Sequence, residues 1–243
     1  MAMKPLAPHR FNAAFQGGQG CAYRLVLDDQ TDRVLRSRAM VVALPSSSFE
    51  EDQHVVLRAM SWQDFEALLA IRGDRAGVRM YYLDGEIEIV SPTKIHEERK
   101  KTLARLLEIW ALEHDLALNG FGSWTLKKEI REAGAEPDEC YIVGDSTEQD
   151  VPDLAIEVEW SRTTGLSKPE IYRRLGVREL WTMKSDGRLI VRVLEKGEWV
   201  ERARSELFPE LDLAWLVSFL DISPQSKAVR ALRDELRSKK RRS

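Results

Sequence analysis

EPDECYIV at residues 136–143 and PDLAIEVEW at residues 152–160 decide how this chain folds. Each segment has a Pro-Asp pair followed by a short apolar run, a pattern that predicts a β-strand, and a polar loop joins the two runs. If the strands pair as neighbours, Asp138 comes close to Glu157. Glu157 interrupts an otherwise apolar strand, where a carboxylate must be solvated, paired or bound to a metal ion.

Regular patterns extend outward from these strands over residues 56–222. Helical spacing of apolar residues, capping residues and Asp-Gly turns indicate where the other elements lie. The sequence predicts helices at residues 61–69, 96–114, 168–175 and 212–220, and hairpins at residues 80–90 and 180–194. This order predicts an α/β fold with a mixed β-sheet flanked by helices, and it lacks the repeated βα units of a barrel.

The two ends of the chain differ in composition from this central domain. Residues 1–55 are irregular and punctuated by Gly and Pro, which predicts an N-terminal extension. Residues 223–243 form a basic C-terminal tail, expected to be a helix that frays toward its end. The tail either contacts phosphates or only keeps the protein soluble, and the sequence leaves both readings open.

Bulk composition excludes several classes of protein. The 243 residues carry a net charge of -3, so contact with nucleic acid must be local rather than spread over the surface. Two cysteines, Cys21 and Cys140, match no zinc spacing and indicate a reduced, cytoplasmic location. No signal peptide or membrane span is expected, since no apolar run approaches about 18 residues. Phosphate loops, nucleophile elbows and zinc-protease motifs are also absent from the sequence.

The acidic pair Asp138 and Glu157 is the strongest candidate for chemistry. Two carboxylates, together with water and a substrate phosphate, suit Mg²⁺, which prefers oxygen ligands and keeps several waters. Such an ion polarises a phosphoryl oxygen and activates a bound water. The alternative is that Asp138 is only a turn residue after proline.

Two further groups of polar residues lie at predicted helix starts. Lys168 opens the helix after the Glu157 strand, so it either points back toward the acids or is an exposed lysine. His96, Glu97 and Glu98 begin the long helix, where they either face the sheet or form a solvated first turn that favours the helix dipole.

Five segments in order resemble the Uma2 family of restriction endonucleases, within the PD-(D/E)xK nuclease superfamily. They are YLDGE at 82–86, Ser91-Pro92 with His96, GAEPDECY at 134–141, PDLAIEV at 152–158 and KPEIYRRLGV at 168–177. The resemblance covers roughly residues 60–220. It implies a restriction-endonuclease-like core and a metal-dependent endonuclease acting on nucleic acid, with DNA favoured.

The resemblance also implies roles for individual residues. Asp138 and Glu157 become metal ligands for Mg²⁺ or Mn²⁺, and Lys168 becomes the catalytic lysine, because Glu159 stands where the superfamily usually has it. Tyr81 replaces a glutamate that many members carry. Additional site residues are then expected among Glu86, His96, Glu97 and Glu98.

Two further expectations follow from the resemblance. The superfamily is compatible with a homodimer. The alternative function is a nuclease fold that has lost its chemistry and serves as a binding module for nucleic acid or protein, and Tyr81 is the residue that favours this reading.

Overall fold

A computed structural model describes residues 40–43, 51–75, 77–122, 124–159 and 165–241. The chain divides into two units, residues 1–37 and 38–243, and every described residue belongs to the second unit. Most of the predicted N-terminal extension, residues 1–55, therefore lies outside the described residues. Within the described part, the strands form two six-stranded sheets.

The first sheet is antiparallel throughout its described pairs. Its central hairpin forms across Asp84-Gly85, where both residues have positive φ, as the sequence predicts for this turn. In spatial order the strands are β1 (Met40–Ala43), β2 (Gln53–Arg58), β4 (Glu86–Ser91), β3 (Arg79–Leu83), β7 (Ala133–Ala135) and β6 (Leu126–Lys128).

The second sheet is mixed, since β9 and β10 are parallel and the other described pairs are antiparallel. Its order is β12 (Glu198–Arg202), β11 (Leu189–Glu195), β10 (Glu179–Lys184), β9 (Leu154–Glu159), β8 (Glu139–Val143) and β5 (Leu118–Phe121). The parallel pair needs a crossover, and α4 (Lys168–Leu175) lies within that connection. The apolar runs that follow Pro137-Asp138 and Pro152-Asp153 form β8 and β9 of this sheet.

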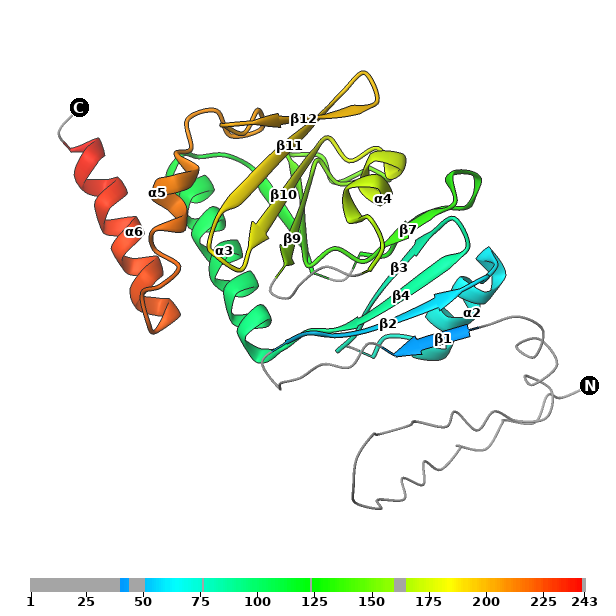
Figure 1. Cartoon of the computed structure of the whole chain (residues 1–243). Helices are drawn as coiled ribbons and strands as arrows, with labels where there is room; N and C mark the ends of the chain where they lie inside the picture. The colour runs from blue at the N-terminus through cyan, green and yellow to red at the C-terminus, as the bar shows by residue number, and fades with distance from the viewer. Residues whose placement is uncertain (1–39, 44–50, 76, 123, 160–164, 242–243) are drawn as a thin grey trace, which may run out of the picture. The chain divides into compact units, whose positions relative to one another are not determined.

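The helices cover the two faces of the second sheet (Figure 1). One face packs against α3 (Lys94–Glu113) and α5 (Leu213–Val217), α6 (Gln225–Lys240) packs in turn on α3, and the core there includes Leu103, Trp110 and Trp181. The other face meets α4 and residues of the first sheet, with Tyr81, Ala155 and Ile171 in the core. The α/β fold class, with β-sheet flanked by helices, is confirmed.

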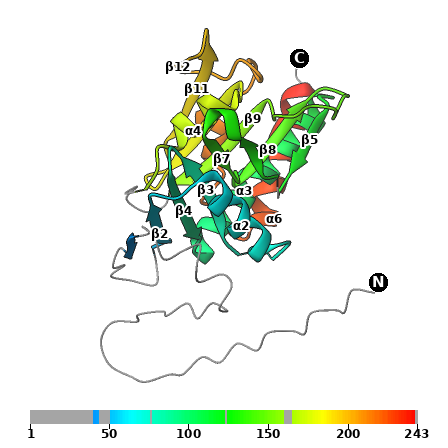
Figure 2. The ribbon, with the colours of Figure 1, turned by 90° about the vertical axis from the view of Figure 1, so that its right-hand side faces the viewer.

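Local sequence signals explain where the helices begin. Ser61 caps α2 (Trp62–Arg72) in a reciprocal capping box with Asp64, and α2 lies against β3 (Figure 2). Ser167 caps α4, and Gly176 ends it in the left-handed conformation that favours glycine. Asp212 caps α5. Among the helices of the described residues, none is long and apolar enough to cross a membrane.

One predicted strand is shorter in the structure. The alternation of Trp124, Leu126, Lys128 and Ile130 predicts a strand, but only Leu126–Lys128 is extended. The chain then turns through the 3₁₀ helix η1 (Glu129–Arg131). Ile130 lies in this turn and is 93% exposed.

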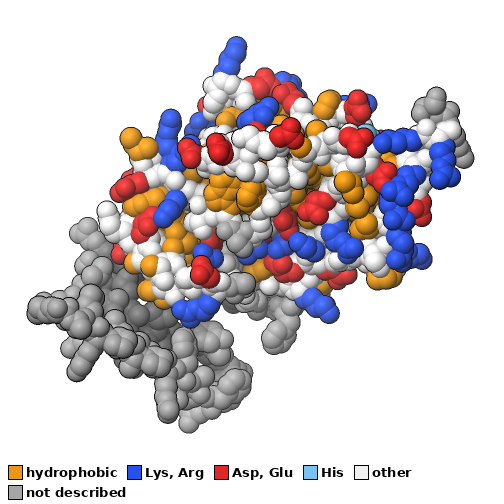
Figure 3. Space-filling view, turned by 180° about the vertical axis from the view of Figure 1, so that it is seen from behind, with side chains coloured by type: hydrophobic (Ala, Val, Ile, Leu, Met, Phe, Trp, Pro, Cys, Tyr) orange, Lys and Arg blue, Asp and Glu red, His pale blue; other side chains and the backbone are white. Residues whose placement is uncertain are grey.

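The basic tail contains a regular helix that packs on the domain. Ala228, Leu232 and Leu236 of α6 are buried against α3, while Lys and Arg side chains gather on the outer surface of α6 (Figure 3). The buried positions recur at four-residue spacing, which is the pattern of an amphipathic helix. Residues 225–240 therefore contribute to the hydrophobic core.

Candidate active site

Of the two acidic residues of the predicted pair, Asp138 immediately precedes β8 and Glu157 lies in the adjacent strand β9. Glu139 of β8 pairs with Ile156 of β9, so the next step along the ladder brings Asp138 beside Glu157. The backbone N–H of Val158 donates to Asp138 Oδ2 at 2.9 Å. Asp138 and Glu157 are each only 1% exposed. Asp138 is thus fixed to the neighbouring strand, and the structure brings both carboxylates into one buried site.

Lys168 points into this site from the first position of α4. Its Nζ atom donates to Glu157 Oε2 at 2.5 Å and to the Tyr81 hydroxyl at 3.1 Å, and the side chain is buried. Burial by itself lowers the pKa of Lys168, but Glu157 and its neighbours outweigh this effect and raise the pKa well above its ordinary value. Lys168 is therefore a cation at neutral pH, able to stabilise negative charge but unable to accept a proton.

Two tyrosines complete the surroundings of Glu157. The Tyr81 hydroxyl from β3 donates to Glu157 at 3.2 Å, and the Tyr172 hydroxyl from α4 hydrogen-bonds to its other oxygen. Burial raises the pKa of both phenols well above 10, so they remain neutral donors. Burial also raises the pKa of Glu157, an effect that Lys168 partly offsets. Glu157 is held by three side-chain donors.

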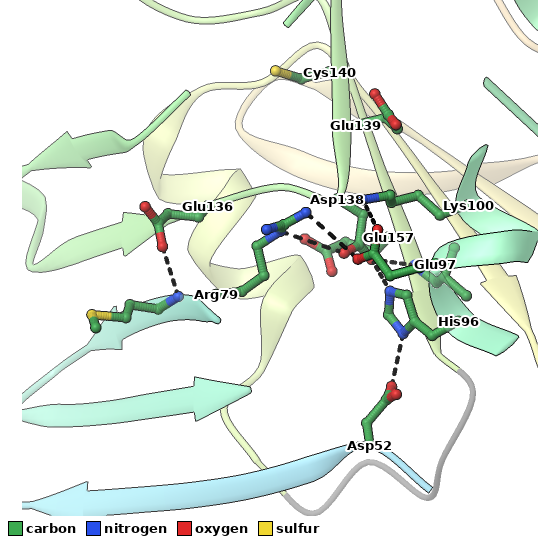
Figure 4. Close-up of polar contacts among 12 residues, drawn as sticks. Asp52, Arg79, His96, Glu97, Lys100, Glu136, Asp138, Glu139, Cys140 and Glu157 are labelled. Carbon is green, nitrogen blue, oxygen red and sulfur yellow. Dashed lines mark hydrogen bonds and ion pairs between the residues drawn. The ribbon is translucent and has the colours of Figure 1, made fainter. Parts of the chain in front are cut away.

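His96 links Asp138 to a further acid. Its Nδ1 atom lies 2.7 Å from Asp52 Oδ2, and its Nε2 atom lies 3.0 Å from Asp138 Oδ2 (Figure 4). The second contact is an ion pair outside good hydrogen-bond geometry. Burial lowers the pKa of His96, but the two carboxylates outweigh it and raise this pKa to about 9. His96⁺ in turn opposes the effect of burial on Asp138, whose pKa falls well below its ordinary value.

Raising the pH is expected to destabilise the metal-free protein through His96. Its pKa is about 9 in the folded state against 6.5 ordinarily, so its stabilising effect is complete below pH 6.5 and declines through about pH 9. The shift corresponds to at most about 3 kcal/mol. Urea unfolding of wild type and His96→Gln in EDTA measures it. Equal pH dependence of the two proteins between pH 6.5 and about 9.5 would contradict the assignment.

The other predicted acids occupy different places. Glu97 lies beside the site, with Lys100 at 2.6 Å and Arg79 at 3.8 Å, and its side chain is 43% exposed. Glu86 pairs with Arg58 on the exposed side of the first sheet. Glu98 is exposed one position further along α3. Of these three, only Glu97 shares a basic neighbour, Arg79, with the central acidic pair.

The side chains of the site can supply only some of the ligands that a metal ion needs. Asp138, just before β8, and Glu157, in β9, supply carboxylate oxygens, which suit a hard divalent cation. Within the described ranges, no three or more His, Cys, Asp or Glu side chains are grouped so that they could hold a metal ion. A bound ion would therefore take its remaining ligands from water, substrate or backbone, an arrangement that Mg²⁺ tolerates.

Comparison with known families agrees with this arrangement. The profile of the Uma2 family, described as putative restriction endonuclease, matches residues 62–223. This chain belongs to the Uma2 family. The Uma2 match begins at α2, continues past α5 and includes Asp138, Glu157 and Lys168. No curated protein matches the chain.

Tyr81 is where this chain departs from the pattern that the Uma2 resemblance implies. The resemblance in the sequence implies a glutamate at this position in many Uma2 members, and here the tyrosine side chain reaches the same buried site, where it contacts Glu157 and Lys168. The ammonium of Lys168 also lies 4.4 Å from the centre of the Tyr81 ring. A neutral hydroxyl thus occupies the place in the site where the resemblance implies an acid.

Sequence reasoning missed three residues of this Uma2 site. Tyr172 follows Lys168 by four positions on α4, a spacing that puts both on one helix face, so this residue was open to prediction. Asp52 precedes His96 by 44 positions, and Arg79 lies on a strand without any motif. No signal in a single sequence connects these two residues to the site.

Proposed function

We propose that this protein is a metal-dependent endonuclease that hydrolyses phosphodiester bonds of nucleic acid, with DNA as the favoured substrate. The observation that carries the proposal is the position of Asp138 directly beside Glu157, with Lys168 Nζ 2.5 Å from Glu157 Oε2. Two buried carboxylates beside one buried cation suit chemistry on a phosphate ester, where a metal ion and a fixed positive charge act together. The Uma2 family description supports the nuclease class.

Asp138 and Glu157 would hold Mg²⁺ or Mn²⁺. When bound, the ion would polarise a phosphoryl oxygen and lower the pKa of a coordinated water. His96⁺ keeps Asp138 ionised and oriented, and Tyr172 orients Glu157. Lys168, as a buried cation, would stabilise the negative charge that develops on the phosphate.

Cleavage assays test this proposal. Supercoiled DNA, single-stranded DNA and RNA are incubated with Mg²⁺, Mn²⁺ or EDTA. Wild type is expected to cleave at least one substrate only with metal, and Asp138→Asn and Glu157→Gln are expected to lose activity roughly a thousandfold, because several kcal/mol of transition-state stabilisation is removed. Glu201→Gln, on the exposed edge strand β12, is the matched control and should cleave like wild type.

A second function, a binding module without catalysis, is favoured by Tyr81. Glu157 accepts hydrogen bonds from Lys168, Tyr81 and Tyr172, so a metal ion must compete with three donors. Calorimetry distinguishes the two functions. Absence of Mg²⁺ and Mn²⁺ binding, together with no cleavage by a folded wild-type protein, would exclude the nuclease and leave the binding module.

A further inference from the structure

A basic cavity opens next to the proposed catalytic carboxylates. Its volume is about 360 Å³, and Arg72, Arg75, Arg79 and Pro137 are among the residues that line it. Pro137 directly precedes Asp138 in the chain, and Arg79 Nε lies 3.8 Å from Asp138 Oδ1. The cavity is therefore adjacent to Asp138, and its arginines could contact whatever extends from a substrate bound there.

Glu136, one of the two acidic residues that line the cavity, already has hydrogen-bond partners for its carboxylate. Its carboxylate accepts a two-point contact from the Arg72 guanidinium, the backbone N–H of Met80 at 2.9 Å and the Thr125 hydroxyl at 2.9 Å. Glu136 is also only 6% exposed. This network joins α2, β3 and the segment before β8, so it fixes the wall of the cavity and neutralises Arg72.

Arg79 differs from Arg72 because its guanidinium makes no hydrogen bond to any residue that the structure describes. Its ion pairs to Asp138 and Glu97 are both 3.8 Å long, which is beyond hydrogen-bond distance, and its side chain is only 14% exposed (Figure 4). No described residue accepts a hydrogen bond from the buried Nε atom. A guanidinium offers five donors, and leaving the buried Nε donor unpaired is unfavourable unless a ligand takes it.

We propose that Arg79 binds a phosphate of the nucleic-acid strand, next to the phosphate that is cleaved, with the strand passing over this cavity. The planar guanidinium matches two oxygens of a phosphodiester, and the exposed Arg75 adds positive charge at the cavity. The three arginines outnumber the two acids of the lining, Asp74 and Glu136. This inference rests on the proposed function, since it assigns a substrate contact to the same site.

Binding measurements without metal test Arg79 separately from catalysis. Anisotropy of a fluorescein-labelled DNA strand and of its duplex is measured in EDTA over a series of salt concentrations. Arg79→Met is expected to weaken binding about tenfold and to reduce the slope of log K against log[salt] by about 1, as for one lost phosphate contact. Arg79→Lys should keep the slope but lose part of the affinity, because lysine lacks the two-point geometry.

The control is Arg202→Met, on the edge strand β12, which removes the same charge and should bind like wild type. Equal affinity and slope for Arg79→Met and wild type would overturn the inference, even where wild type cleaves DNA. A wild type that cleaves but shows no metal-free binding would overturn it too. A wild type that neither binds nor cleaves would remove the proposed function as well. If Arg79→Met does not fold, unchanged affinity of Arg79→Lys would overturn the two-point contact, and weaker binding at the same slope would support it.

Discussion

Replacing Lys168 by methionine is expected to destabilise the fold by about 3–5 kcal/mol, the usual consequence of removing one partner of a buried ion pair. Lys168 is 7% exposed and Glu157 is 1% exposed, so water cannot replace the lost ammonium group. The Tyr81 and Tyr172 hydroxyls remain, but neutral donors balance a buried carboxylate only in part. The free energy of unfolding, measured by urea titration, checks this result.

A double variant separates charge from packing. Lys168→Met combined with Glu157→Gln removes both charges, and it should recover most of the lost stability while cleavage stays absent. Lys127→Met is the exposed control, because Lys127 pairs with Glu66 at the surface and should change stability by at most about 1 kcal/mol. If Lys168→Met unfolds as easily as Lys127→Met, Lys168 does not stabilise Glu157 as the structure indicates.

Replacing Tyr81 by glutamate is expected to make stability strongly dependent on metal. Without metal, the variant adds a third carboxylate beside Glu157 and Asp138, and like charges in a buried site should destabilise the protein by several kcal/mol. A glutamate is shorter than a tyrosine, so it leaves room for an ion at about 2.1 Å from its oxygens. Saturating Mn²⁺ should then restore about 3 kcal/mol at a hundredfold excess over Kd.

Thermal unfolding with EDTA and with Mn²⁺ measures this dependence. Tyr81→Phe is the matched control, because it loses only the hydroxyl, and it should cost about 1 kcal/mol and gain no new metal response. A Tyr81→Glu protein that Mn²⁺ stabilises no more than wild type would mean that position 81 is not close to an ion-binding position. The proposed roles of Asp138 and Glu157 would then need a different geometry.

Much of the fold was open to prediction because its signals are local. The Asp84-Gly85 hairpin, the capping box at Ser61 and the helix that Gly176 ends depend on residues a few positions apart. The strand Ala133–Ala135 carries no such signal, since its Ala-Gly-Ala sequence has neither alternation nor β-branched residues. This strand joins the first sheet through contacts with distant residues, so the presence of a second sheet was not predicted.

The sequence predicted some residues of the candidate site and not others. Asp138 and Glu157 stand out because each acid accompanies an apolar strand, and the structure brings these two residues together with Lys168. The interpretation of Lys168 as an exposed lysine is wrong, because its ammonium is buried against Glu157. Asp52 and Arg79 join the site only through tertiary packing, which a single sequence does not reveal.

The packing of α6 on α3 extends the folded domain beyond the region that the Uma2 profile matches. The Uma2 match ends at residue 223, but Ala228, Leu232 and Leu236 are buried further along the chain. A fragment cut at that boundary would expose an apolar strip on α3 to water, and such strips promote aggregation. His96 lies at the start of α3. The region matched by the Uma2 profile therefore depends on α6, which lies outside the match, to shield the apolar side of the helix that carries this site residue.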